Sequence, residues 1–235
     1  MKLLRALKWA AAVALLLFSG TCVYFSGVVL AARQYTAETV LPAVRTARFP
    51  LAVSDLTPRQ LHILLAVQDP GFYRHSGVDL CTPGAGLTTI TQSLVKKLYF
   101  ENFEPGLSKL RQTLIAAYAL DPMMTKDEQL TAFLNMMYLG NGATGFAEAS
   151  AIYFGKPFAW LSEDEYISLV AMIIAPAVFD LKKHPERNAE RSARIRRLAD
   201  GEYTPKGLMD LYYGSVDEDA RKDLPPVSYF PGYYQ

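Results

Sequence analysis

The sequence is poor in cysteine and nearly balanced in charge. Its two cysteines, Cys22 and Cys81, allow one disulfide at most, and Cys22 lies in an apolar N-terminal run, which argues against a bond to Cys81. We therefore expect Cys81 to be a free or buried thiol, and two isolated cysteines do not make a metal cluster. The net charge of +1 leaves almost no excess of basic residues, so the charge balance gives no indication of nucleic-acid binding.

The sequence also lacks internal repeats and any long alternation of polar and apolar residues, which is the pattern of a half-buried β-strand. Hydrophobic residues make up 51% of the chain and charged residues 20%, which is typical of a folded domain with an apolar addition and excludes a disordered chain. A length of 235 residues accommodates one globular domain plus an anchor. We expect this domain to be mainly α-helical.

The one long uncharged segment runs from Trp9 to Ala32, and Lys2, Arg5 and Lys8 precede it. It exceeds the roughly 20 apolar residues that cross a bilayer as a helix. A cleaved signal peptide is the alternative, but its apolar core is usually about 7–15 residues long, so we favour a retained transmembrane helix. The basic residues before the segment predict a cytoplasmic N-terminus and place the rest of the chain outside the cytoplasm.

The segment after the predicted membrane helix reads as a connector, because Pro42 and Pro50 are expected to interrupt any helix there. The predicted organisation is a cytoplasmic N-terminus (1–8), a transmembrane helix (9–32), a connector (33–55), a domain (56–200) and a C-terminal tail (201–235).

Helix-start signals divide the domain. Thr57, which precedes a proline, begins a predicted helix that ends near Gln68, and a second predicted helix starts near Thr89. Capping boxes at Thr125 and Ser162 begin two further helices.

Two more helices are expected, one over 107–120 and a long one near the end of the domain. In the last helix Arg187, Arg191 and Arg194 share one face, which we expect to be solvated, with anionic lipid headgroups as a lesser alternative.

Two neighbouring stretches, 67–79 and 86–97, crowd an aspartate, a histidine, glycines, hydroxyls and amides around one short segment. This composition is typical of a functional site. The most informative letter is Gln68, because an amide stands where acid–base chemistry would require a carboxylate.

These stretches resemble the first two motifs of the peptidoglycan glycosyltransferases, glycosyltransferase family 51, which read roughly E-D-x-x-F-x-x-H-x-G-x-D and G-G-S-T-I-T-Q-Q-L-x-K-N. The matching residues are Asp69, Phe72, His75, Gly77, Asp79, Gly86, Thr89, Ile90, Thr91, Gln92, Leu94 and Lys96. The departures are Gln68, Leu87, Thr88, Ser93 and Lys97. The resemblance continues through 134–142, 145–156 and 184–187, in family order and spacing.

The resemblance implies a lysozyme-like fold and a reaction in which a hydroxyl of lipid II attacks the anomeric carbon of a glycan that carries a lipid pyrophosphate. That reaction requires a general base and positive charge near the departing pyrophosphate. The family's base is the glutamate that opens the first motif, and a second glutamate, in a motif reading R-K-x-x-E, assists at the pyrophosphate. Gln68 and Thr113 occupy these two catalytic positions here, and neither side chain accepts a proton near neutral pH.

The resemblance also implies the substrate-binding residues Asp69, His75, Thr89, Gln92, Lys96 and Lys109. Gln92 and Lys96 lie four residues apart on one predicted helix face, which suits a pyrophosphate but is also the pattern of a solvated face. For His75 a hydrogen-bonded packing role is favoured over catalysis. Phe100 and Phe103 either dip into the membrane, as this family's jaw region does, or pack in the core.

A substitute base is the remaining question about catalysis. Asp69 follows Gln68 directly but points about 100° away from it on a helix. Glu101 and Glu104 lie in a predicted loop, and Asp79 matches a family position with a structural role.

The leading hypothesis is a membrane-anchored, mainly α, lysozyme-like domain that binds lipid II or glycan strands with impaired or absent polymerase activity, and that partners with cell-wall synthases. An active polymerase with a rearranged site is the alternative. A lysozyme-like hydrolase ranks last, because no glutamate general acid stands at a helix end. The resemblance implies the bacterial plasma membrane, with the domain on the extracytoplasmic side. It requires no cofactor, and it leaves open a divalent metal at the pyrophosphate.

Overall fold

The computed structural model describes residues 2–79, 82, 88–104 and 106–205. Within these residues the regular structure is helical, and the extended backbone forms only one isolated antiparallel bridge, between Tyr138 and Thr144. The prediction of a mainly α-helical domain is therefore confirmed. Cys81, Leu87 and most of the predicted tail lie outside the described residues.

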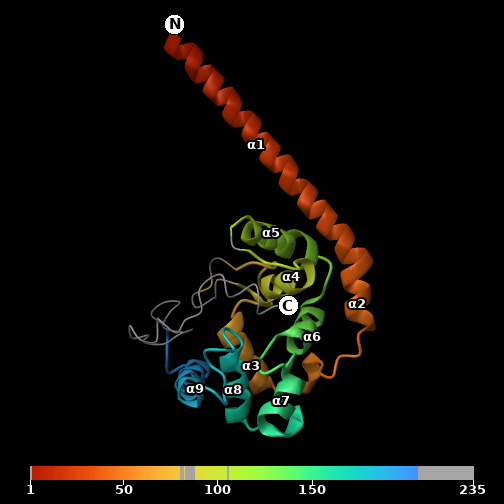
Figure 1. Ribbon diagram of the computed structural model, residues 1–235, viewed down its shortest axis with the longest axis vertical. Coiled ribbons are helices and arrows are strands. Elements are labelled where there is room, and N and C mark those ends of the chain that lie inside the picture. The colour runs from red at the N-terminus through yellow and green to blue at the C-terminus, as the bar shows by residue number, and fades with distance from the viewer. Residues whose placement is uncertain (1, 80–81, 83–87, 105, 206–235) are drawn as a thin grey trace.

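The N-terminal helix α1 (Lys2–Tyr35) projects from the domain as a single rod (Figure 1). Together with the segments that follow it, α1 forms one helical stretch, Leu4–Thr46, which is long and apolar enough to cross a membrane. The side chains of its most apolar window are not buried against the domain. The expected apolar helix is thus present.

The chain remains helical through Pro42, so the expectation that this proline interrupts a helix is wrong. A π-helical segment, η1 (Thr36–Val40), follows α1, and α2 (Leu41–Thr46) follows directly. Pro42 lies in the first turn of α2, where a missing N–H is tolerated, and the wider turn of the π-helical segment accommodates the ring.

The predicted helices of the domain are confirmed, including the caps at Thr57, Thr89, Thr125 and Ser162. In each cap the hydroxyl accepts a hydrogen bond from the backbone N–H three residues later. The helices are α3 (Pro58–Gln68), α4 (Ile90–Tyr99), α5 (Leu107–Ile115), the π-helical η3 (Ala116–Leu120), α6 (Lys126–Met136), α7 (Phe146–Phe154), α8 (Glu163–Met172) and α9 (Pro185–Ala199). Short 3₁₀ turns occupy Val53–Asp55 and Phe158–Trp160.

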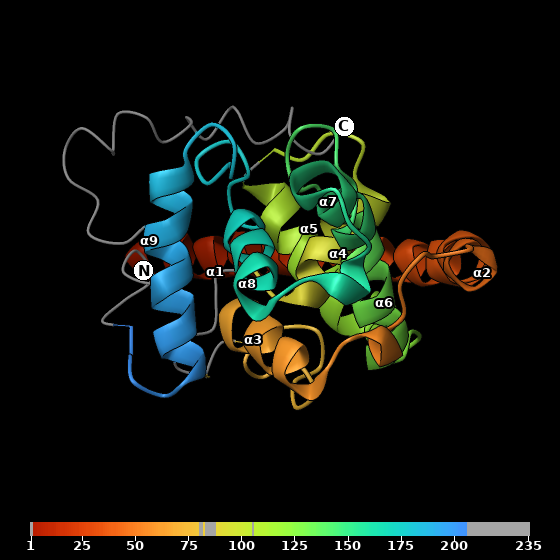
Figure 2. The same cartoon turned by 90° about the horizontal axis from the view of Figure 1, so that it is seen from below.

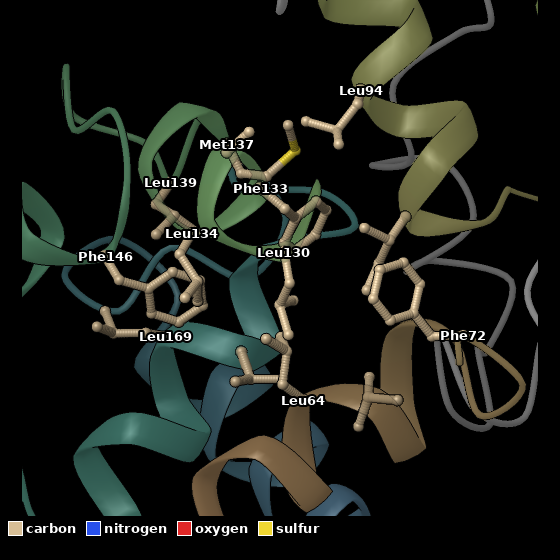
Figure 3. Close-up of a cluster of buried hydrophobic side chains, with 14 of the residues drawn as sticks. Leu64, Phe72, Leu94, Leu130, Phe133, Leu134, Met137, Leu139, Phe146 and Leu169 are labelled. Carbon is tan, nitrogen blue, oxygen red and sulfur yellow. The ribbon is translucent and has the colours of Figure 1, made fainter. Parts of the chain in front are cut away.

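One hydrophobic core joins these helices. Figure 3 shows Leu64 of α3, Leu94 of α4 and Leu130 of α6 pointing into a common interior, and all three side chains are fully buried. Phe72, from the loop after α3, closes this core at 1% exposure. The packing fixes the end of α3 relative to the start of α4, and each of these helix ends carries residues of one of the two motifs.

Helices α8 and α9 lie side by side at one edge of the domain (Figures 1 and 2). The expectation of a solvated arginine face on α9 is wrong for Arg191, which is 0% exposed. Its Nε donates to the carbonyl oxygen of Ala171 at 2.9 Å, and its guanidinium lies 5.2 Å from the ring of Phe179. Helical spacing groups Arg191 with the other arginines of α9, but α8 packs over Arg191 and buries it.

Candidate functional site

The site begins where α3 ends. Asp69 follows Gln68 as the C-cap of α3, outside helical geometry, and is only 1% exposed. Its Oδ1 accepts a hydrogen bond from His75 Nε2 at 2.8 Å, and its Oδ2 accepts one from the backbone N–H of Ile90 at 3.0 Å. A carboxylate at the first residue of α4 also complements the positive end of that helix. Asp69 thus ties the first motif to the second.

The second motif is braced at its cap. Thr89 Oγ1 accepts from the N–H of Gln92 at 3.1 Å and donates to the carbonyl oxygen of Gly77 at 2.7 Å, while Gln92 Oε1 accepts from the N–H of Thr89 at 3.0 Å. Gly77 has a φ of +81°, and a Cβ there would lie 2.5 Å from the carbonyl oxygen of Ala116 in η3. Only glycine fits this close approach, which holds the first motif against η3.

The second glutamate position, Thr113, lies on α5 and faces α4. Thr113 Oγ1 accepts from Gln92 Nε2 at 3.0 Å and donates to the carbonyl oxygen of Lys109 at 2.9 Å. Beside it, Gln112 Nε2 donates to the carbonyl oxygen of Gln92 at 2.7 Å. The position is therefore a neutral hydroxyl that connects α5 to α4 and does not act as an acid or base near neutral pH.

Two lysines converge on this region from different helices. Lys109 of α5 donates to Thr88 Oγ1 at 2.9 Å, and Lys96 Nζ of α4 lies 4.7 Å from the ring of Phe103. Burial lowers the pKa of the Lys109 ammonium group. Burial, followed by repulsion from Lys109, lowers the pKa of Lys96 to about 8. The two helices thus concentrate positive charge in a half-buried place, which suits an anionic group.

The first glutamate position, Gln68, lies at the C-terminal end of α3 and is half-buried. Its Nε2 is buried and has no hydrogen-bond partner among the described residues. An unsatisfied buried amide is costly, and a ligand or water oxygen would satisfy it. Gln68 therefore offers a hydrogen-bond donor where the family has a base.

The carboxylates considered as substitute bases are placed as follows. Asp69 uses both oxygens in the two hydrogen bonds that join the motifs, and Asp79 Oδ1 accepts from the N–H of Thr82 at 2.9 Å. Glu101 and Glu104 are exposed to solvent. Asp69 is therefore buried but committed through both oxygens, and the two glutamates are not buried. Asp79 is half-buried beside Asp69 and His75, and its Oδ1 is committed to Thr82.

Metal binding does not fit the two glutamate positions, because neither Gln68 nor Thr113 supplies the carboxylate that Mg²⁺ prefers. One ligating atom each from Asp69, His75 and Asp79 lies within 4.8 Å of the others. Asp69 is already committed to His75 and Ile90, so we interpret this group as a structural cluster.

The structure thus divides the six predicted substrate-binding residues into two sets. Asp69, His75, Thr89 and Gln92 use polar side-chain atoms inside the protein, whereas the ammonium groups of Lys96 and Lys109 form the cationic patch. Thr88 and Phe103 contact the two ammonium groups of this patch. Neither of them was predicted as a site residue from the sequence. The signal for Thr88 is its place in the second motif, although it departs from the family's residue there.

Comparison with known proteins identifies the family of the chain. The family model described as "Transglycosylase" matches residues 36–199. A candidate transglycosylase of Cupriavidus necator is 29% identical over 218 residues, which covers 83% of this chain and 94% of the relative. Penicillin-binding protein 4 of Bacillus subtilis is 32% identical over 71% of this chain, and penicillin-binding protein 1A of Escherichia coli is 28% identical over 69%.

The chain spans only 30% and 21% of the length of these two penicillin-binding proteins. The family match nevertheless covers the whole domain from η1 to the end of α9, with both motifs inside it. The chain therefore belongs to the transglycosylase family of peptidoglycan synthesis, glycosyltransferase family 51, and its helical domain is the lysozyme-like domain of that family.

Proposed function

We propose that this chain is a membrane-anchored family member that binds lipid II, or the glycan strand made from it, with impaired or absent polymerase activity. In this proposal α1 is a single-pass anchor in the bacterial plasma membrane, with the N-terminus in the cytoplasm and the domain on the extracytoplasmic side. Cell-wall synthases are the proposed protein partners. The basic residues before the apolar run and its length support this topology.

The observation that carries the proposal is the combination of a cationic patch with two neutral catalytic positions. Burial and, after it, repulsion from Lys109 lower the pKa of Lys96, so an anion bound beside both ammonium groups would relieve their repulsion. A lipid pyrophosphate carries such a charge. The motif residues Asp69, Thr89 and Gln92 hold α4 and α5 in place through hydrogen bonds, which supports a retained ligand site beside these helices.

The chemistry of the two glutamate positions supports the second half of the proposal. Removing one positioned general base typically costs about 10²–10⁴ in rate, and here both positions lack a titratable group. Such losses are not additive when two groups act as a unit, but neither amide nor hydroxyl restores proton transfer. The cleft is therefore proposed to hold its ligand without turning it over efficiently.

A binding measurement with the full chain in detergent tests the proposal. Lipid II or a phosphoglycolipid inhibitor of the moenomycin type should bind the wild type, and Lys96→Ala should weaken binding by about 1.5–3 kcal/mol through loss of a charge-assisted contact. Lys97→Ala, at the adjacent position of α4, is the matched control and should bind as the wild type does. A wild type that binds neither ligand would refute the retained cleft.

A further inference from the structure

The N-terminal helix contacts the two helices that carry the cationic patch. In Figure 1 the second half of α1 passes beside α5. Tyr24 of α1 accepts a hydrogen bond from Arg111 Nη2 through its hydroxyl, and the Arg111 guanidinium lies 5.5 Å from the Tyr24 ring. Arg111 stands midway between Lys109 and Thr113 on α5. This contact joins the apolar helix directly to the helix that carries half of the patch.

Two further contacts extend this connection. Arg33 Nη1 donates to the carbonyl oxygen of Tyr118 in η3 at 2.8 Å. The hydroxyls of Thr36 and Tyr99 lie 2.6 Å apart, and Thr36 is fully buried. Because Tyr99 is the last residue of α4, the helical stretch that begins with α1 contacts both α4 and α5.

The first turns of α5 depend on such contacts, because the helix is weakly capped at its N-terminal end. Its N-cap, Gly106, has a φ of +103° and provides no side-chain cap. The nine residues of α5 continue directly into the five of η3, and isolated helices below about 12–15 residues are marginal in water. Gln112 and Thr113 attach one side of α5 to α4, and Arg111 attaches another side to α1. The orientation of Lys109 is then set from both sides.

We propose that Tyr24 and Arg111 are positioning residues for the cationic patch, so that the apolar N-terminal helix is part of the scaffold of the site as well as an anchor. The pair holds α5 in the orientation that brings Lys109 next to Lys96. The functional part of this inference rests on the proposed ligand binding. The structural part, the restraint of α5 by α1, is independent of it.

Hydrogen exchange in the full-length chain, in the same detergent, measures the restraint directly. Tyr24→Leu and Arg111→Gln should each speed amide exchange in residues 107–115 by about 3- to 10-fold, while exchange in α6 and α8 is unchanged. Arg111→Lys retains a cation that can donate to Tyr24, so it should exchange more slowly than Arg111→Gln. The double variant should exchange no faster than either single variant, because both remove the same contact.

Phe18→Leu is the matched control, because Phe18 is an exposed aromatic residue of α1 at 67% exposure. It should leave exchange in α5 unchanged. Affinity for the moenomycin-type phosphoglycolipid should fall about 3- to 10-fold in Tyr24→Leu and Arg111→Gln and stay constant in Phe18→Leu.

Each outcome decides part of the inference. Unchanged exchange in residues 107–115 in both variants would overturn the restraint, whatever the ligand result. Faster exchange with unchanged affinity would overturn the link between the restraint and binding. A wild type that binds no phosphoglycolipid would count against the proposed function, and the exchange rates would still decide whether α1 holds α5.

Discussion

At the scale of single residues, Lys96 is the group whose charge changes in an accessible pH range. Burial and the neighbouring Lys109 lower its pKa from 10.5 to about 8. An anion binds the protonated ammonium group and disfavours the neutral amine. The affinity for a pyrophosphate ligand should therefore be highest below about pH 8 and should fall as the pH rises through that value.

Lys96→Arg provides the comparison for this pH dependence. A guanidinium stays charged at every accessible pH, so the variant should retain its affinity to higher pH than the wild type. Measuring ligand affinity between about pH 6 and pH 10 for both proteins checks this expectation. An identical decline in the two proteins would show that Lys96 is not the titrating group.

Several site residues could be predicted from the sequence, but the extent to which their side chains are buried could not. The resemblance identified Lys96 and Lys109, which the structure brings together. The four-residue spacing of Gln92 and Lys96 predicted a shared face and said nothing about burial, and Gln92 is only 4% exposed, with its amide bonded to Thr89 and Thr113. Arg191 illustrates the same limit, because helical spacing identifies a face and the neighbouring helix decides whether it is solvated.

At the scale of elements, the start of α4 has more structural roles than the other helix starts. Thr89→Ala removes an N-cap and also leaves the buried carbonyl of Gly77 without its donor. Thr125→Ala removes the N-cap of α6 at an exposed position. We expect losses in unfolding free energy of about 2–3 kcal/mol for Thr89→Ala and about 1 kcal/mol for Thr125→Ala. Urea unfolding of both variants in one detergent measures the difference, and equal losses would contradict the bracing role.

Helix boundaries were largely predictable because they depend on local signals. Capping boxes and threonine caps involve residues that lie within four positions of one another, and the cap hydroxyl bonds only within the first turn of its own helix. The course of the chain at Pro42 was not predictable in this way. Whether a proline ends a helix depends on its position in the turn and on the π-helical segment before it, which has no distinct sequence signal.

At the scale of the whole molecule, the proposed topology rests on one apolar helix and the basic residues before it. A reporter fused after Gln235 should be active only in an extracytoplasmic compartment. Replacing Lys2, Arg5 and Lys8 with glutamine should lower the fraction of molecules in this orientation, because positive residues before the helix keep that end in the cytoplasm. Cytoplasmic activity of the wild-type fusion, or a mature protein that begins near Gln34, would contradict the proposed anchor.

The proposed loss of turnover rests on the two neutral catalytic positions, Gln68 and Thr113. Gln92 Nε2, which donates to Thr113, would still reach a carboxylate placed there, so Thr113→Glu is compatible with the local hydrogen bonds. Gln68→Glu restores the group at the end of α3 that would take the acceptor proton. The single Gln68→Glu change should recover the larger part of any restored activity.

A lipid II polymerisation assay on the purified full-length chain tests the central claim most directly, with an active family member measured in parallel. We predict that the unmodified protein polymerises lipid II at least about 10²-fold more slowly than the active member, or not at all. The variant that combines Gln68→Glu with Thr113→Glu should exceed the unmodified protein. Polymerisation by the unmodified protein at the rate of the active member would contradict the account, because another residue would then be acting as the base.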